Sequence, residues 1–224
     1  MGGVIPLGDA SRQLRRWPVV TVGLIATNVY VFIQELMYGQ RFVLLHSVIP
    51  ARIVAGHGWG TILTGMFMHA SWLHIIGNMV FFWAFGPAIE DAMGRFRFLA
   101  FYLLGGMIAM LAQVAAMPTS HVPNLGASGA IAAVMGAFLV TYPSDRIRTA
   151  IWFLFFVRIT YVPAVLLIGI WFLMQVFSAG AVAHNVQSGG VAYLAHIGGF
   201  LFGVLTGRLW RRGVETGGQW QRFN

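Results

Sequence analysis

The chain has 224 residues, of which 58% are apolar and only 9% carry a charge. This composition lies far outside that of soluble domains and indicates a protein embedded in a bilayer. At about 20 residues per crossing the apolar residues suffice for about six helices, which excludes a large extramembrane domain. The net charge of +8 comes from arginine alone, and we interpret it as a topology signal and not as a nucleic-acid-binding surface. Cysteine is absent, so a nucleophile must be an oxygen.

The hydropathy pattern predicts an all-α membrane protein, a six-transmembrane-helix bundle that forms a single domain over residues 1–224. The N-terminal segment is polar and basic and leads into an apolar run that is too long for a signal peptide, so we expect it to be a cytoplasmic lead into the first span. The expected spans are residues 18–34, 73–89, 98–116, 125–142, 162–179 and 191–209.

The arginines are distributed unevenly between the two sides of this bundle. The long first loop on one side carries two of them, Arg41 and Arg52. The segments that flank the spans on the other side carry many more, among them Arg12, Arg15, Arg16, Arg95, Arg97, Arg146, Arg148, Arg208, Arg211 and Arg212. By the positive-inside rule both termini are expected to be cytoplasmic. Because no transit peptide is evident, we expect a bacterial plasma membrane.

Two segments do not fit simple connections between spans. Residues 37–72 are longer than a connector requires and contain apolar pieces, so we expect a structured loop that is partly embedded in the membrane. Residues 150–177 are too long for one crossing. We expect 151–160 to lie along the cytoplasmic interface and the fifth span to begin near Pro163; a single long kinked helix is the alternative.

Polar side chains within a bilayer are costly, so each is a functional candidate. His74, Asn78, Ser128 and His196 lie in the first two turns of the second, fourth and sixth spans, which all enter from the extracytoplasmic side. At about 1.5 Å per residue the four lie within about 10 Å of depth. The other three polar residues occupy odd-numbered spans, and we expect interhelical hydrogen bonds from them: Asn28, Gln113 and Gln175.

Ser128 follows a loop that contains Pro123 and Asn124, and glycines flank it in the sequence Gly-Ala-Ser-Gly. This pattern places the serine in the first turn of the fourth span. The unpaired N–H groups of a helix N-terminus suit an oxyanion. A helix face of small residues that packs against a neighbour is the simpler interpretation of this segment.

His196 is followed by Gly199 and Gly203, a GxxxG pattern that allows close approach to the small-residue face of the fourth span. That approach would bring His196 to Ser128, where an imidazole can activate an alcohol. No carboxylate lies at this depth, so the pattern indicates a dyad. A lone histidine in a span is otherwise more often structural or a ligand.

His74 and Asn78 are four residues apart and share a helix face. Both can donate hydrogen bonds to an oxyanion, although they could instead only tie the second span to the loop before it. We expect His69, just outside the span, to be a loop anchor.

Together the three segments resemble the rhomboid intramembrane serine proteases. The family's HxxxxHxxxN motif is present as His69, His74 and Asn78. Its GxSG motif is residues 126–129, and its AHxxGxxxG motif is residues 195–203. The resemblance covers essentially the whole chain. It implies Ser128 as nucleophile, His196 as general base and acid, and an oxyanion hole from the Ser128 N–H, His74 and Asn78. It also implies that the fifth span and residues 180–190 act as gate and cap over a water-filled pocket.

The sequence departs from this family at two positions. The aromatic residue that often stacks on the catalytic imidazole is replaced by Ala132, so another group must orient His196. The Trp-Arg pair frequent in the first loop appears as Trp59-Gly60.

The function expected from this resemblance is cleavage of single-pass transmembrane protein substrates near the outer membrane face, without a cofactor or a bound metal. Two alternatives remain at this point. One is a catalytically inactive rhomboid-like protein that binds membrane helices, and the other is a metal or haem protein ligated by His69, His74 and His196.

Overall fold

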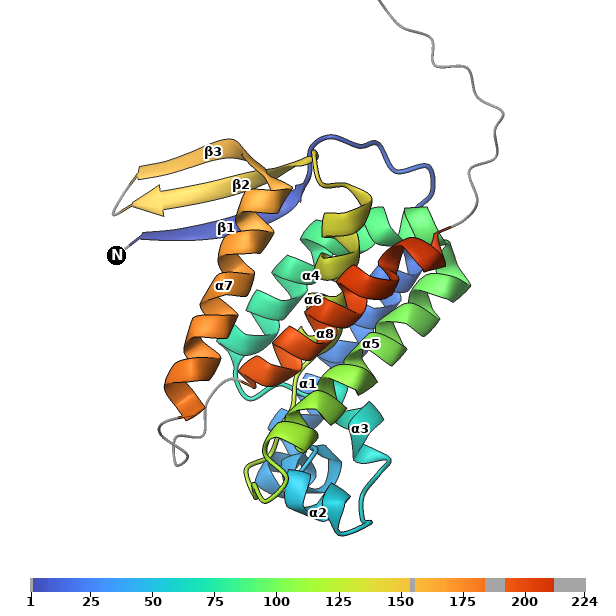
Figure 1. Ribbon diagram of the computed structural model, residues 1–224, viewed down its shortest axis with the longest axis vertical. Helices are drawn as coiled ribbons and strands as arrows, with labels where there is room; N and C mark the ends of the chain where they lie inside the picture. Colours follow the sequence, from blue (N-terminus) through green and yellow to red (C-terminus); the bar gives the residue numbers. More distant parts are fainter. Residues whose placement is uncertain (1, 154–155, 184–191, 212–224) are drawn as a thin grey trace, which may run out of the picture.

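A computed structural model describes residues 2–153, 156–183 and 192–211, which form a bundle of helices with a small sheet at one end (Figure 1). Its elements in chain order are β1 (Gly2–Asp9), α1 (Val19–His46), α2 (Pro50–Val54), α3 (Thr61–Thr64), η1 (Gly65–Phe67), α4 (Trp72–Met93), α5 (Arg95–Ala116), α6 (Ser128–Thr141), β2 (Arg146–Phe153), β3 (Phe156–Pro163), α7 (Ala164–Ala183), α8 (Tyr193–Thr206) and η2 (Gly207–Trp210).

Helix α6 forms the centre of the bundle and packs against α4, α5 and α8. Every residue from 129 to 138 is buried. A helix that is apolar on all sides has no solvent-facing stripe and is stable only when neighbours or lipid surround it. The helix that begins with Ser128 is therefore fixed by packing on all sides.

Glycines set the separation between α6 and α8. A Cβ on Gly199 would lie 2.1 Å from the carbonyl oxygen of Gly129, and one on Gly203 would lie 2.0 Å from that of Ala133. Side chains at these positions would overlap the backbone of α6, so the two helices can approach this closely only because glycine occupies both. The expected packing of the GxxxG face against the fourth span is confirmed.

Three of the described helices are long and apolar enough to cross a membrane: α1, α4 and α5. Helix α6 and residues 164–179 of α7 are shorter apolar helices. At about 1.5 Å per residue the 14 residues of α6 span about 21 Å, less than the hydrocarbon thickness of about 30 Å.

The expectation of an all-α fold was wrong in one region. Residues 146–153 and 156–163 form the paired strands β2 and β3, and β1 completes an antiparallel sheet of order β1-β2-β3. The alternative of one long kinked helix is therefore wrong for the described residues of this segment, and α7 begins directly after Pro163, as expected for the fifth span. The segment is rich in β-branched and aromatic residues, which favour strands, but its apolar content resembles that of a span.

The long first loop is structured, as expected. Helix α1 continues past residue 34 to His46 through a kink at Gly39, whose φ of 65° lies in the left-handed region that favours glycine. The loop is also fastened to the segment before Ser128. Val48 and Asn124 exchange backbone hydrogen bonds of 2.9 and 2.7 Å, and the Gly126 N–H donates to the Gly65 carbonyl at 2.9 Å.

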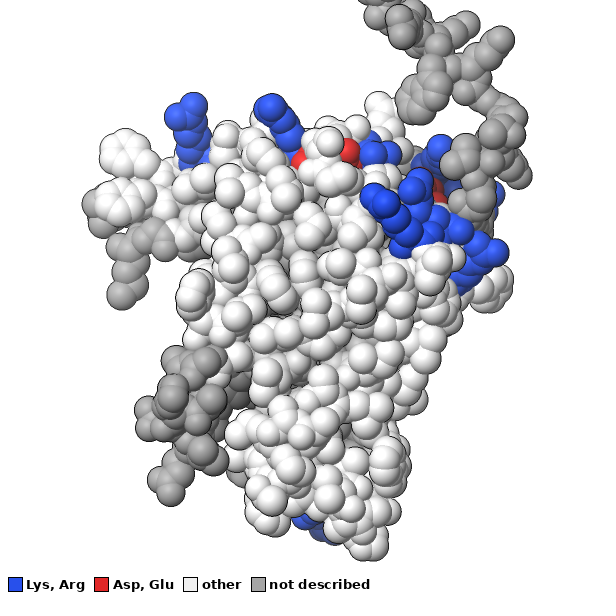
Figure 2. Space-filling view, in the orientation of Figure 1, with Lys and Arg blue, Asp and Glu red and all other residues white. Residues whose placement is uncertain are grey.

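The basic side chains gather at the end of the bundle that carries the sheet (Figure 2). Contacts tie several of them to this end: the Arg97 side chain donates to the Arg211 carbonyl at 3.1 Å, and Arg208 donates to the Val140 carbonyl at 2.8 Å. The start of α5, the end of α6 and the segment after α8 therefore lie at one end of the molecule.

Glu90 of α4 caps the N-terminus of α1. Its buried carboxylate accepts hydrogen bonds from the backbone N–H groups of Val20 (3.0 Å) and Thr21 (2.7 Å) and from the Thr21 hydroxyl (2.7 Å). The residue before the helix, Pro18, provides no side-chain cap. A side chain remote in sequence thus satisfies the free donors of the first turn.

Replacing Glu90 with alanine should lower the free energy of unfolding by about 3 kcal/mol, because buried donors lose their only acceptor. Glu90→Gln keeps one acceptor oxygen and should cost about 1 kcal/mol. Thermal unfolding in detergent measures both variants. Equal stability of the two would contradict the capping role.

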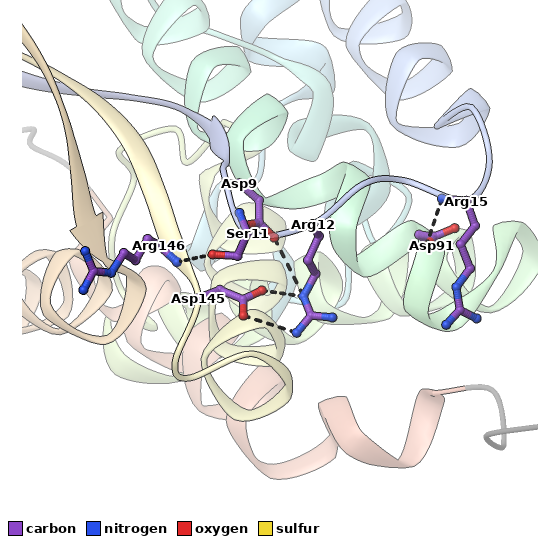
Figure 3. Close-up of polar contacts among 7 residues, drawn as sticks. All are labelled: Asp9, Ser11, Arg12, Arg15, Asp91, Asp145 and Arg146. Carbon is purple, nitrogen blue, oxygen red and sulfur yellow. Dashed lines mark hydrogen bonds and ion pairs between the residues drawn. The ribbon is translucent and has the colours of Figure 1, made fainter. Parts of the chain in front are cut away.

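Asp9, Arg12 and Asp145 form a cluster where the sheet joins the bundle (Figure 3). The Arg12 guanidinium donates to both carboxylate oxygens of Asp145 and lies 3.5 Å from the ring centroid of Tyr142. Asp9 accepts the Ser11 N–H at 2.8 Å. Burial, reinforced by the negative charge of Asp145, raises the pKa of Asp9 to about 6, and the Ser11 N–H and Arg12 oppose this shift only in part.

Because the pKa of Asp9 is raised in the folded state, protonation of Asp9 stabilises the fold. This contribution is complete below the ordinary pKa of 3.8 and is lost as the pH rises through about 6. Asp9→Asn should therefore unfold at a higher temperature than the wild type at pH 7.5 and at the same temperature below pH 4. Asp91→Asn serves as a control for the change in charge, and a difference that does not depend on pH would contradict the prediction.

Candidate active site

Ser128 is the first residue of α6 and is half-buried. The loop before it is held by Asn124 and Gly126, which bond to the first loop at Val48 and Gly65. The hydroxyl therefore sits on a rigid helix end, beside backbone N–H groups that have no partner within the helix. This is the position expected from the sequence.

His196 lies in the first turn of α8, and its side chain meets Ser128. The distance between His196 Nε2 and Ser128 Oγ is 2.7 Å, within hydrogen-bonding range. His196 is only 7% exposed, so the pair is shielded from bulk solvent on the imidazole side. The glycine-mediated approach of α8 to α6 brings the two side chains together.

The second ring nitrogen of His196 contacts α7. Nδ1 lies 2.6 Å from Oε1 of Gln175, and Gln175 Nε2 donates to the Trp171 carbonyl at 3.4 Å. The Trp171 ring lies 5.8 Å from the imidazole, centroid to centroid. Helix α7 therefore supplies both an aromatic neighbour and a polar contact on the side of the ring away from Ser128, whereas the buried Ala132 on α6 supplies neither.

His74 of α4 faces the loop before Ser128 across Gly126. A Cβ on Gly126 would lie 3.0 Å from His74 Nε2 and 3.6 Å from Ser128 Oγ, and the φ of this residue is 133°. Position 126 therefore requires glycine, both because of its positive φ and because a side chain there would crowd His74. His74 Nδ1 accepts the Ala70 N–H at 3.4 Å, which leaves the ring proton on Nε2, the nitrogen that faces the serine loop.

Asn78 follows one turn after His74 on α4 and is half-buried. Within the described part of the chain its amide nitrogen Nδ2 is buried and has no hydrogen-bond partner. A buried donor without an acceptor is costly, and a group that binds only during a reaction is one explanation for it.

His69 lies outside the pair formed by Ser128 and His196. Its backbone N–H donates to the buried carboxylate of Glu35 at 2.9 and 3.2 Å, and its ring packs edge-on against that of His74 at 5.1 Å. These contacts tie the start of α4 to α1. Glu35 lies at the end of the expected first span, and no motif marked it as a partner of His69.

The polar residues of the odd-numbered spans behave differently from one another. Gln113 accepts the Ala195 N–H at 3.2 Å and so joins α5 to α8, as expected. Asn28 donates to Leu24 within its own helix at 2.7 Å. Gln175 contacts His196 directly, a link that its spacing in the sequence did not reveal.

Among the described residues, no three His, Asp or Glu side chains are grouped closely enough to hold a metal ion. The segment expected to form a cap, residues 180–190, lies largely outside the described residues.

The family model described as Rhomboid domain matches residues 56–213. The chain is 30% identical over 218 residues to the bovine mitochondrial presenilin-associated rhomboid-like protein, covering 88% of this chain and 52% of the relative. It is 29% identical over 128 residues to the putative rhomboid protease YdcA of Bacillus subtilis, covering 56% and 63%. It is also 34% identical over 94 residues to the rhomboid protease GluP of the same organism, covering 42% and 18%. The chain thus spans about half the length of the first of these relatives.

Proposed function

The chain belongs to the rhomboid family, and from this premise we propose that it is an intramembrane serine endopeptidase with a Ser128–His196 dyad. The observation that carries the proposal is the 2.7 Å contact between Ser128 Oγ and His196 Nε2. Two relatives are named as a rhomboid protease or a putative one, which supports this reaction class.

In the proposed reaction Ser128 Oγ attacks the carbonyl carbon of the scissile peptide while His196 Nε2 takes the hydroxyl proton. The tetrahedral intermediate then collapses, and the imidazolium gives this proton to the leaving amine. A water molecule next attacks the acyl-enzyme, again with His196 as base, and releases the second product and the free serine.

The negative charge that develops on the substrate oxygen requires hydrogen-bond donors. The Ser128 N–H, His74 Nε2–H and Asn78 Nδ2 are the donors of the proposed oxyanion hole. The tautomer of His74 and the buried, unpartnered amide of Asn78 both support this assignment.

Asn78→Ala should reduce kcat by about 100-fold, as loss of one oxyanion donor typically does, with little effect on KM or stability. Steady-state cleavage of a model substrate together with thermal unfolding measures the three quantities. A normal kcat, or a loss of activity explained entirely by unfolding, would remove Asn78 from the oxyanion hole.

We further propose that α1, α4, α5, α6, α7 and α8 are six membrane spans with both termini cytoplasmic. The gathering of arginines at one end supports this orientation. Because α6 is about 9 Å shorter than the hydrocarbon thickness and ends near the arginine-rich side, Ser128 would lie below the opposite, outer surface.

A nucleophile at this depth acts on peptide bonds at the outer ends of transmembrane helices. The scissile bond must be freed from its helical hydrogen bonds, so the proposed substrates are single-pass proteins with small or helix-weakening residues near that end. The proposed location is a bacterial plasma membrane, although six relatives are mitochondrial proteins by name.

The test is cleavage of a panel of tagged single-pass proteins in proteoliposomes, with the products identified by mass. The wild type should cut at least one substrate near its outer end, and Ser128→Ala should cut none. Binding without cleavage by the wild type would favour the inactive rhomboid-like alternative. Cleavage that a chelator abolishes would favour metal chemistry.

A further inference from the structure

His196 needs a defined tautomer to serve as a base toward Ser128. Nε2 can accept the serine proton only when it carries none itself, so the single proton of the neutral ring must be on Nδ1. The group that contacts Nδ1 decides this tautomer, and here that group is Gln175.

The amide orientation of Gln175 is fixed by its other contact. Nε2 donates to the Trp171 carbonyl, one turn earlier on α7, at 3.4 Å. With the amide reversed, Oε1 would face that carbonyl, and two acceptors would repel each other. Oε1 therefore faces His196, and an acceptor at 2.6 Å from Nδ1 favours a proton there.

Both side chains are removed from water, which increases the effect of the contact. Gln175 is 9% exposed and His196 is 7% exposed. A hydrogen bond in such surroundings has no competing water to replace it. The Trp171 ring, 5.8 Å from the imidazole, limits rotation of the ring on the same side.

We infer that Gln175 is a positioning residue for the dyad: it holds His196 in the tautomer and orientation in which Nε2 accepts the Ser128 proton. The inference rests on the proposed function. It gives α7 a role in the chemistry, because the dyad is correctly arranged only while α7 packs against α8. It also identifies the group that orients His196 in the absence of an aromatic residue at Ala132.

Three variants separate this role from simple packing. Gln175→Leu keeps the volume and removes the acceptor, whereas Gln175→Glu keeps an acceptor at the same reach. Gln113→Leu is the matched control, since Gln113 is an equally buried amide that bonds to the neighbouring residue of α8, the Ala195 N–H, and not to the imidazole. Thermal unfolding verifies that each variant is folded.

The first readout is the rate at which a fluorophosphonate probe labels Ser128. Gln175→Leu should be labelled about tenfold more slowly than the wild type, and Gln175→Glu should recover the wild-type rate. Gln113→Leu should stay within about twofold of the wild type. A wild-type rate in Gln175→Leu, or an equal loss in Gln113→Leu, would overturn the inference.

The second readout does not depend on activity. Nitrogen-15 NMR of histidine-labelled protein, with the His196 signals assigned from the His196→Ala spectrum, should show a protonated Nδ1 and an unprotonated Nε2 in the wild type and a mixture of tautomers in Gln175→Leu. An unprotonated Nδ1 in the wild type would overturn the inference. If the tautomer is as expected but the wild type is neither labelled nor active, the proposed function fails and the role of Gln175 in fixing the ring stands.

Discussion

Replacing His196 with alanine is expected to abolish substrate cleavage while the protein remains folded. Among the described residues no other side chain is hydrogen-bonded to Ser128 Oγ, so the alcohol would lose the base that contacts it. General-base catalysis typically increases the rate by about 10²- to 10⁴-fold. Removing the base from a nucleophile–base pair lowers the rate by a factor at the upper end of this range or above it. We expect kcat to fall by about 10⁴-fold, measured as product formed from a model transmembrane substrate.

The control for this variant is its stability. The His196 ring is buried and bonds to both Ser128 and Gln175, so alanine leaves a small cavity and should lower the free energy of unfolding by about 1–3 kcal/mol. Activity that survives at more than about one hundredth of the wild-type level in folded His196→Ala would contradict the role of this residue as base.

Gly203→Leu is expected to have the largest effect on folding. A Cβ at this position would lie 2.0 Å from the Ala133 carbonyl oxygen of α6. Because that oxygen belongs to the backbone, the overlap can be removed only if one of the two helices moves. Separation of α6 and α8 should destabilise the protein by about 3 kcal/mol or more and should also draw His196 away from Ser128. Yield of folded protein, melting temperature and probe labelling should all fall.

Gly169→Leu is the matched control for this prediction. It introduces the same side chain into another apolar helix, α7, where a Cβ would lie within 4 Å of no described atom outside the adjacent residues and the helix's own backbone. This variant should retain near-normal stability and labelling. Equal damage in both variants would mean that leucine in a membrane helix, and not the close approach of α8 to α6, causes the effect.

The parts of the fold that followed from the sequence are those with strong local signals. Long apolar runs predicted α1, α4 and α5, and the small residues of α6 and α8 predicted their close packing. The sheet was not predicted. Its strands β1 and β2 lie more than 130 residues apart in the sequence, and no local sequence pattern indicates that they pair. Apolar residues in a strand also resemble those of a span by composition.

In the candidate site, too, the residues with a local sequence signal were predicted and those without one were not. Ser128 and His196 were expected to meet from their positions along two helices and from the glycines between them. Gln175 was expected only to join helices, because its place on the turn of α7 that faces the imidazole depends on how α7 packs. Glu35 and Glu90 likewise act on distant backbone N–H groups, and such partners cannot be identified from spacing.

The central claim, that Ser128 is a nucleophile activated by His196, is tested most directly by covalent labelling with a fluorophosphonate probe followed by mass spectrometry of the modified peptide. The wild type in proteoliposomes should carry the adduct on Ser128, and heat-unfolded wild type, Ser128→Ala and His196→Ala should carry little or none. An adduct of equal yield in Ser128→Ala, or no adduct in folded and correctly inserted wild type, would contradict the account.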